Sequence, residues 1–346
     1  MQSTKINLII NSTIVKFVML GILYLSYQSK SFAQDPIFTQ FYNNMTLINP
    51  AFSGTTDNYL VSAQARMQQI SIGVPYKTFS AGASRRFKSL GGGLGLNVLY
   101  DDAGSGVLKT SKIAIPYSYE LKINNEIYVR GGLNFGMVSK ALDWNKLIFG
   151  DQLDPINGGI SPGGTPYPSQ EVRPNSVSHI LFDFGSGFLI HSPNFYLGIS
   201  FDHLNRPNDG FLNNPGFKGV PLRWSIQAGY TIVLSRYNKK ESASFISSNV
   251  LWVKQGDFAQ LNIGGYIGLR QFIFGLAYRN AGTNPDAILA SVGLRKGKIR
   301  WIYSFDYTIS QLGINSGGSH ELGFLINFDI GSRKKIDYSD CFSLFR

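Results

Sequence analysis

The feature that most constrains the fold is an alternation of large apolar with small or polar side chains, repeated along the chain in segments separated by turn residues. In residues 301–310, one set of alternate positions is aromatic and aliphatic, and the other set includes Ser, Asp and Thr. The same division occurs in residues 127–138 and 321–330. Because a period of two residues places each set on one side of an extended chain, these segments are predicted to be β-strands.

The composition of the two faces separates a soluble β-sandwich from a membrane barrel. A sandwich would expose charged side chains and would use strands of roughly five or six residues. Here only 15% of the residues are charged, and the polar face is mainly Gly, Ser and Asn. Membrane-spanning strands of about 9 to 11 residues around a polar lumen fit this pattern, and lipid forbids an open sheet edge. The sequence therefore predicts an all-β fold, a transmembrane antiparallel β-barrel.

About fourteen strands are expected within a barrel domain at residues 59–330. If both ends of this domain are periplasmic, the two longest connections, 141–177 and 205–221, lie outside the cell, and the short turns lie mostly inside, as in bacterial barrels. The Pro- and Gly-rich loop 141–177 is expected either to fold over the barrel mouth or to be a mobile surface loop. The strands are placed near 59–70, 77–87, 92–101, 108–122, 126–140, 178–190, 194–204, 222–235, 243–254, 258–270, 272–281, 287–296, 299–311 and 318–330.

The two ends of the chain lie outside the expected barrel. Residues 1–33 have the parts of a signal peptide: basic residues, an apolar run at 17–25, and the small residues of Ser31-Phe32-Ala33 before a cleavage site. The run is shorter than the roughly 20 apolar residues of a spanning helix, so cleavage before Gln34 is expected. Residues 331–346 are predicted to be a polar periplasmic tail.

Residues 34–58 fit neither the signal peptide nor the strand series. Their first part, 34–54, contains two Pro, three Asn and two Gln without a regular period, so a short irregular segment is predicted. Unpaired backbone groups cannot face lipid, which places the segment in the lumen or the periplasm. It is expected either to plug and brace the barrel or to bind a partner. The candidate residues for either role are Gln40, Tyr42, Asn49, Pro50, Ala51 and Gly54.

Charge and cysteine content exclude several classes of protein. Removal of residues 1–33 takes away three of the 32 Lys and Arg residues and no acid, which leaves 29 basic against 21 acidic side chains. This excess is scattered, so no nucleic-acid partner is expected. Cys341 is the only cysteine in the sequence, which leaves no internal disulfide and no Cys-rich metal site.

No constellation of residues points to catalysis. The acidic pairs Asp101-Asp102 and Asp151/Asp154 lack the calcium-loop pattern and are expected to be solvated loop acids. Ser200, Asp202 and His203 resemble a lipase triad only by sequence proximity, which does not establish geometry. No histidine has a second ligand at metal-binding spacing, so no catalytic residue, metal or cofactor is expected and the chain is predicted not to be an enzyme. The histidines are His179 and His320 at strand starts, His191 in a tight turn, and His203 at a strand end.

Both ends of the expected mature chain resemble one known family. The residues that carry the resemblance are Gln34-Asp35-Pro36, Gln40-Phe41-Tyr42, Leu47-Ile48-Asn49-Pro50-Ala51-Phe52-Ser53-Gly54, and, at the last strand, Ser319-His320-Glu321-Leu322-Gly323 with Asn327-Phe328. In these residues the chain resembles the PorP/SprF family of type IX secretion system membrane proteins. The amino-terminal motif is the more specific of the two ends.

The resemblance implies a bacterial outer-membrane component of the type IX secretion system, which supports secretion or surface attachment of cargo proteins such as gliding adhesins. The implied partners are outer-membrane lipid, type IX translocon subunits, and secreted cargo or an adhesin with a C-terminal sorting domain. The alternatives are a passive porin and a fatty-acid-transporter-like channel for hydrophobic solutes. A hydrophobic channel needs a continuous apolar lumenal path, whereas the side chains expected to face inward are polar. They are Arg130, Asn134, Asn262, Asp306, Asn327 and Asp329.

Overall fold

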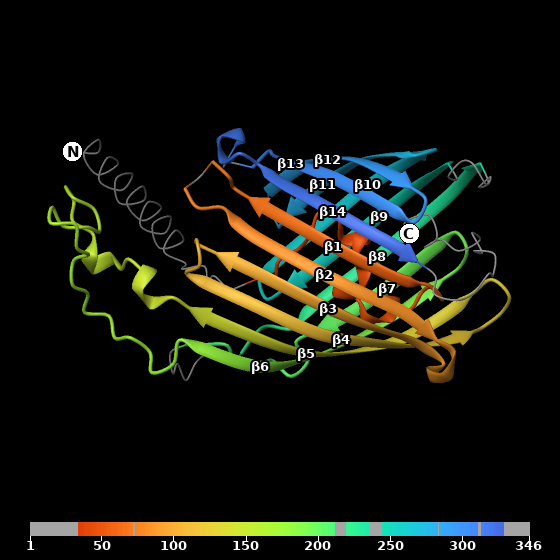
Figure 1. Ribbon diagram of the computed structural model, residues 1–346, viewed down its shortest axis with the longest axis horizontal. Helices are drawn as coiled ribbons and strands as arrows, with labels where there is room; N and C mark the ends of the chain where they lie inside the picture. Colours follow the sequence, from red (N-terminus) through yellow and green to blue (C-terminus); the bar gives the residue numbers. More distant parts are fainter. Residues whose placement is uncertain are drawn as a thin grey trace, which may run out of the picture. The chain divides into compact units, whose positions relative to one another are not determined.

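The computed structural model describes residues 34–71, 73–211, 219–235, 244–282, 284–310 and 313–328. Within them, fourteen strands form one closed sheet, in which each strand pairs with its neighbours in sequence and β1 pairs with β14 (Figure 1). The predicted antiparallel β-barrel is therefore confirmed. The strands are β1 (Tyr59–Gln68), β2 (Tyr76–Phe87), β3 (Gly92–Ala103), β4 (Leu108–Lys122), β5 (Tyr128–Leu142), β6 (Ser178–His191), β7 (Phe195–Asp202), β8 (Arg223–Ser235), β9 (Ser244–Gln255), β10 (Phe258–Leu269), β11 (Phe272–Ala281), β12 (Asn284–Lys296), β13 (Ile299–Thr308) and β14 (Ser319–Phe328).

The barrel closes where its first and last strands meet. β1 and β14 pair in antiparallel register, from Tyr59 opposite Phe328 to Gln68 opposite Ser319. This pairing uses the backbone N–H and C=O groups that an open sheet would leave at its edges. Because an unpaired backbone group in lipid costs several kcal/mol, closure is what allows the sheet to span a membrane.

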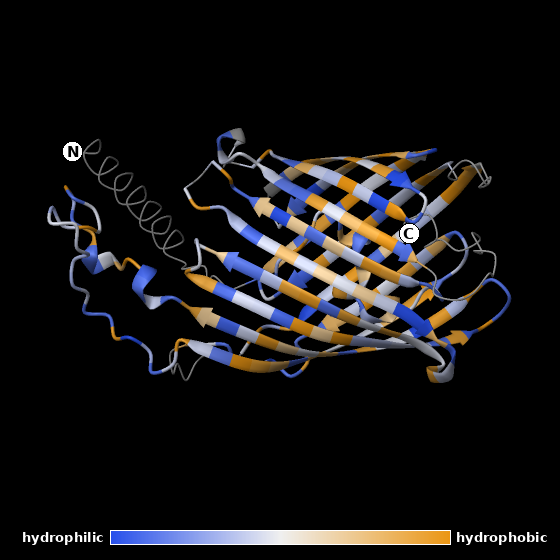
Figure 2. Cartoon of the chain, viewed as in Figure 1, coloured by the Kyte–Doolittle hydropathy of each residue, from blue (hydrophilic) through white to orange (hydrophobic). Residues whose placement is uncertain are grey.

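Side chains alternate between the two faces of the barrel wall, as the alternating colours along the strands in Figure 2 show. On β5, Leu133 and Phe135 are half-exposed on the outer face, and Arg130 and Asn134 are buried inside. The outer face is thus apolar and suited to lipid, and the inner face is polar. Of the residues expected to face inward, Arg130, Asn134, Asn262 and Asp306 are buried, Asn327 is partly buried, and Asp329 lies outside the described residues.

The two ends of the barrel differ in their connections. At the end where odd-numbered strands finish, which we call the loop end, lie the long connections 143–177 and 203–222. At the opposite end, the turn end, most connections are tight, such as 192–194 and 297–298. By the rule for bacterial barrels, the loop end faces the cell exterior. The expected signal peptide and tail, and the connection 236–243, lie outside the described residues.

The loop 143–177 is organised by contacts within itself. Trp144 packs on Phe149 with their ring centroids 4.9 Å apart, and the Asp151 carboxylate accepts hydrogen bonds from Ser169 and the N–H of Gln170. Most of its side chains are exposed, and Figure 1 shows the loop extending beyond the strand ends. It therefore does not fill the barrel mouth.

Helical structure in the described residues consists of short 3-10 turns. No helix in this part of the chain has the length and apolar character needed to cross a bilayer. The turns are η1 (Phe41–Asn43), η2 (Met45–Leu47), η3 (Pro50–Phe52), η4 (Lys88–Leu90), η5 (Trp144–Lys146), η6 (Gly150–Gln152) and η7 (Ile314–Ser316). The first three lie before β1, in the region that the sequence predicts to be irregular.

A charge placed on the outer face should destabilise the barrel according to its depth in the membrane. Phe135→Arg, in the middle of β5, is expected to lower the free energy of unfolding by about 2–4 kcal/mol, whereas Leu121→Arg, near the turn end of β4, should cost about 0–1 kcal/mol. Urea titration of the barrel in lipid vesicles, with heat-modifiable gel mobility as the readout, measures both. Equal losses at the two positions would contradict this placement of the wall in lipid.

Candidate functional site

The lumen of the barrel contains residues 34–58, which we call the lumenal segment. It includes η1, η2 and η3, and most of its side chains between positions 38 and 54 are buried. The local sequence explains the last of these turns. The side chain of Asn49 accepts a hydrogen bond from the N–H of Ala51 at 2.9 Å, and Pro50 occupies the first position of η3, where no N–H is needed.

The lumenal segment runs the length of the barrel. At the loop end, the N–H of Asp35 donates to Oε1 of Gln255, the last residue of β9, at 3.0 Å. At the turn end, the carbonyl of Thr56 accepts the N–H of Arg86, next to the last residue of β2, at 2.9 Å. The segment thus starts at the loop end and reaches β1 from the turn end.

At the loop end, Asp35 belongs to a network of charged side chains. His203, directly after β7, lies 3.0 Å from Asp35 through Nε2 and 2.9 Å from Asp183 through Nδ1. Asp183 also accepts a hydrogen bond from Lys112 Nζ at 2.7 Å, and Arg223 Nη1 lies 3.6 Å from the Asp35 carboxylate. This loop-end network connects the lumenal segment to β4, β6 and β8.

The charges in this network keep His203 protonated. Burial alone would lower the pKa of His203, but the Asp35 and Asp183 carboxylates outweigh burial and raise this pKa to about 10. Burial likewise opposes ionisation of Asp35, but the positive charge of His203 holds the Asp35 pKa well below its usual value. At neutral pH, His203 is therefore an imidazolium whose two N–H groups donate to two carboxylates.

A second buried cluster holds the next part of the segment. Arg66 of β1 pairs with Asp306 at 2.7 Å and with Glu321 at 3.1 Å, and none of the three is more than 2% exposed. The Glu321 carboxylate accepts the backbone N–H groups of Thr39 at 2.7 Å and Gln40 at 2.8 Å. Because a buried carboxylate is costly unless it is paired and hydrogen-bonded, the lumenal segment completes the solvation of Glu321.

Gln40 connects the segment to three strands. Its Nε2 group donates to the carbonyl of Ile302 at 3.1 Å, to Ser304 Oγ at 3.0 Å and to the carbonyl of Glu321 at 3.2 Å. Its own backbone carbonyl accepts a hydrogen bond from Gln64 Nε2 at 2.9 Å. The amide of Gln40 is therefore held in one orientation, between β1, β13 and β14.

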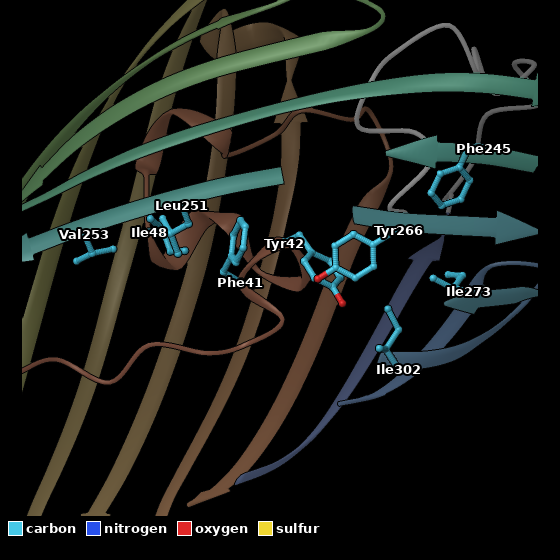
Figure 3. Packing of buried hydrophobic residues seen from close by; sticks show 9 residues of the cluster. All are labelled: Phe41, Tyr42, Ile48, Phe245, Leu251, Val253, Tyr266, Ile273 and Ile302. Atoms are coloured by element: carbon cyan, nitrogen blue, oxygen red, sulfur yellow. The ribbon is translucent and has the colours of Figure 1, made fainter. Parts of the chain in front are cut away.

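Tyr42 connects the segment to an apolar part of the wall. Its ring meets that of Tyr266 of β10 edge to face, with the centroids 4.4 Å apart. Figure 3 shows this pair, and it shows Phe41 and Ile48 of the segment beside Leu251 of β9. An aromatic contact of this geometry contributes about 0.5–1.5 kcal/mol beyond the buried area, so the cluster stabilises the segment as well as the wall.

Asn49 binds the opposite part of the wall. Its Nδ2 group donates to the carbonyls of Phe188 at 3.1 Å and Ile199 at 3.2 Å, and to Gln227 Oε1 at 3.0 Å. A Cβ atom at Gly187 of β6 would stand 2.0 Å from Asn49 Oδ1. The amide thus reaches backbone acceptors of the strands because the wall has a glycine where the two meet.

The last part of the site also packs directly on the backbone of the wall. A Cβ atom at Gly132 of β5 would lie 2.3 Å from the backbone nitrogen of Ala51 and 2.6 Å from the carbonyl carbon of Pro50. Gly54 has a φ of +60°, and a Cβ atom there would lie 2.4 Å from the Cα of Gly93. Only glycine fits this turn and this approach.

The structure places all six candidate residues of the segment in the lumen, but it does not bring them together in one patch. Gln40 contacts β13 and β14, Tyr42 contacts β10, and Asn49 contacts strands from β6 to β8. Pro50, Ala51 and Gly54 follow against β3 and β5. The six side chains form a buried line along the barrel, each against a different part of the wall.

The charges that hold the segment are not predicted from the sequence. Arg66, Glu321 and Lys112 are absent from the sequence-based candidates, although all three lie on strands. A signal was present in the strand assignments themselves. An ionisable residue in a membrane-spanning strand is costly in lipid, so it points to a partner inside the barrel.

The histidine expectations require correction. Ser200 and His203 do not form a lipase site, because Ser200 Oγ donates to the carbonyl of Ile48 at 2.7 Å and His203 binds the two carboxylates of the loop-end network. His191, expected in a turn, is instead the buried last residue of β6, since the strand extends one residue further than predicted. Within the described part of the chain, no group of three or more His, Cys, Asp and Glu residues could hold a metal ion.

Several solved outer-membrane structures are similar to this chain in part. The toluene transporter TbuX of Ralstonia pickettii has 9% sequence identity and a TM-score of 0.44, over 82% of this chain and 93% of that chain. The Acinetobacter baumannii outer membrane protein Omp33 has 8% identity and a TM-score of 0.43, over 80% and 100%. A Pseudomonas aeruginosa FadL homologue has 14% identity and a TM-score of 0.39, over 81% and 90%. No curated protein sequence matches the chain.

The closed sheet with its apolar outer face and polar, occupied lumen defines an outer-membrane β-barrel. A sequence model of one family matches residues 30–325, which include the lumenal segment and almost all of the strands. The chain belongs to this family, the type IX secretion system membrane proteins PorP/SprF. It is therefore a membrane component of that secretion system in the bacterial outer membrane, as the resemblance at its two ends implies.

Removal of the Glu321 charge should loosen the lumenal segment. Glu321→Gln leaves Arg66 with a single carboxylate and presents an amide group to the N–H groups of Thr39 and Gln40. Loss of one partner from a buried ion pair costs about 3–5 kcal/mol, so a stability loss of that order is expected, with faster hydrogen exchange at these two amides. Glu126→Gln, in an exposed turn, is the matched control. Unchanged exchange in Glu321→Gln would contradict the assigned contacts.

The loop-end network should weaken at alkaline pH. The folded-state pKa of His203 is raised from 6.5 to about 10, so protonated His203 stabilises the fold fully below about pH 6.5, and this contribution is lost as the pH rises through about 10. The charged groups that face His203 are Asp35, Asp183, Asp202, Lys112 and Arg223. Unfolding measured between pH 6.5 and 10.5 should show this loss in the native protein and not in His203→Gln. Identical pH profiles would contradict the network.

Proposed function

We propose that this barrel is a closed outer-membrane platform that supports the secretion or surface attachment of cargo proteins, such as gliding adhesins with a C-terminal sorting domain, and that it performs no catalysis. Family membership supports the place in type IX secretion. The observation that carries the further step is the lumenal segment, which runs from the loop end to the turn end with its side chains bound to the wall. A lumen occupied in this way suits docking at the barrel ends better than passage of solutes.

The six candidate residues brace the barrel in this proposal. Gln40, Tyr42, Asn49 and Ala51 are each less than 5% exposed, so a partner reaches them only if the segment leaves the lumen. Displacement would strip the hydrogen bonds from Glu321 and from the wall carbonyls that Asn49 binds. Partner contact is therefore assigned to the surfaces at the two ends of the barrel.

At the loop end, the surface assigned to cargo is the loop 143–177. Its exposed apolar side chains include Ile156 at 91% and Val172 at 79% exposure, which is unusual for large aliphatic residues in a folded loop. By the rule for bacterial barrels this loop faces the cell exterior, where cargo is displayed. At the turn end, the proposed partners are type IX translocon subunits, with the expected periplasmic tail at 331–346 as an additional contact.

Affinity purification tests this function directly. The tagged protein is extracted from outer membranes in detergent, and its companions are identified by mass spectrometry. Enrichment of type IX translocon subunits, or of a large adhesin with a sorting domain, is the expected result. Recovery of the barrel alone, with bound lipid or fatty acid, would contradict the proposal and favour a channel for hydrophobic solutes.

Substitutions in the segment test the bracing role. Asn49→Ala leaves two wall carbonyls and Gln227 without a donor, which should cost about 1–3 kcal/mol, and Tyr42→Ala removes the contact with Tyr266. Both variants should reduce the amount of folded barrel and reduce cargo display in proportion. Asn125→Ala, in an exposed turn, should change neither. Lost display at normal barrel abundance would show instead that these side chains bind a partner.

A further inference from the structure

A pocket lies in the loop-end half of the lumen, between the lumenal segment and the wall formed by β3 to β6. Its lining is largely apolar and comes from both sides. Phe38 and Ile48 belong to the segment, and Leu99, Ala114, Val138 and Leu181 belong to the wall. The segment thus fills the lumen incompletely and itself forms one side of the pocket.

Two buried amide side chains in this pocket each have an atom without a partner in the described residues. Asn97 is 2% exposed, and its Oδ1 atom accepts hydrogen bonds from Asn44 and Thr46, which leaves its Nδ2 donor unpaired. Asn134 is 7% exposed, and its Oδ1 acceptor is unpaired. Buried donors and acceptors are normally satisfied, so this pair indicates a ligand that supplies one acceptor and one donor.

The charged groups around the pocket are already neutralised. Lys112 pairs with Asp183, and Lys140 pairs with Asp209. Asp35, His203 and Arg223, which also line the pocket, belong to the loop-end network. A ligand that enters this site therefore gains most from apolar surface and neutral hydrogen bonds, and an anionic head group finds no unpaired cation among these residues.

The spacing of the two asparagines selects among neutral ligands. Asn97 on β3 is opposite Ala114 of β4, and Asn134 on β5 is opposite Pro116 of the same strand. Two neighbouring strand spacings separate their backbones, roughly 10 Å. One amide group cannot reach both side chains across this distance. A peptide can, because its C=O and N–H groups recur along its length between apolar side chains.

We propose that this pocket binds a short peptide segment with apolar side chains. A peptide carbonyl accepts a hydrogen bond from Asn97 Nδ2, a peptide N–H donates to Asn134 Oδ1, and the apolar side chains pack among Ala114, Val138 and Leu181. The assignment of this peptide to an exported protein rests on the proposed function. The preference of the pocket for a peptide rests on the lining residues alone.

The test uses the purified full chain in detergent micelles and the probe acetyl-Leu-Ala-Leu-amide, with binding followed by isothermal titration calorimetry. Saturable binding is expected. Asn134→Leu should weaken it about tenfold through loss of the acceptor, and Ala114→Phe should abolish it by filling the pocket. The matched control is Asn262→Leu. Asn262 is also buried in the lumen with an unpaired Oδ1, but it does not line the pocket, so binding should be unchanged.

Two comparison ligands separate a peptide from other occupants. A depsipeptide analogue, in which ester oxygens replace the backbone N–H groups, should bind more weakly than the peptide to the native protein and equally weakly to Asn134→Leu. Laurate represents an acyl chain with an anionic head group. Tighter binding of laurate than of the peptide, or no saturable binding of the peptide, would overturn the proposal.

Folding of each variant is checked by heat-modifiable gel mobility. If Asn134→Leu does not fold, Ala114→Phe still tests the site, and peptide binding unaffected by it would overturn the proposal. The experiment uses the isolated barrel and a synthetic probe, so its outcome does not depend on cargo. Failure of peptide binding with normal cargo display would overturn the pocket and leave the proposed function standing.

Discussion

The buried carboxylates of Asp306 and Glu321 need more hydrogen bonds than a neighbouring arginine supplies, and this need organises the lumen. Arg66 pairs with both of them. The lumenal segment then adds two backbone N–H groups to Glu321 and the hydroxyl of Thr39 to Asp306. A buried ion pair is weak evidence for stability by itself, but the loss of a partner from such a pair is strongly destabilising. The wall and the segment therefore depend on each other.

The segment is held by a different kind of interaction at each level of the barrel. Ion pairs of His203 act at the loop end, aromatic packing of Tyr42 and amide hydrogen bonds of Asn49 act in the middle, and contact with the glycine backbone of the wall at Gly132 follows. Distribution along the barrel makes displacement of the whole segment costly. We therefore interpret the segment as a permanent part of the barrel, with function located at its ends and in the pocket that it leaves open.

The sequence predicts the wall of the barrel well because lipid imposes a simple rule on it. Alternation on β5 and β13 follows from one apolar and one polar environment, and strand number follows from turn spacing. The contacts inside the lumen follow no such period. Asn49 meets Gln227 and Glu321 meets Gln40 across long separations in sequence, so their partners are set by closure of the sheet. The loop-end role of His203 was hidden for the same reason, because Asp35 and Asp183 lie far from it along the chain.

Chemical cross-linking within the lumen tests the central claim, that residues 34–58 lie against the inner wall, most directly. In a Cys341→Ser background, Thr46→Cys and Asn97→Cys join positions whose side chains are in hydrogen-bond contact, Thr46 Oγ1 to Asn97 Oδ1 at 3.0 Å. A short bifunctional thiol reagent applied to intact outer membranes should link this pair. It should not link Thr46→Cys with Asn262→Cys, because β3 and β10 lie on opposite sides of the fourteen-stranded barrel. Absence of the first cross-link, or equal yields for both pairs, would show that the segment does not occupy the lumen as described.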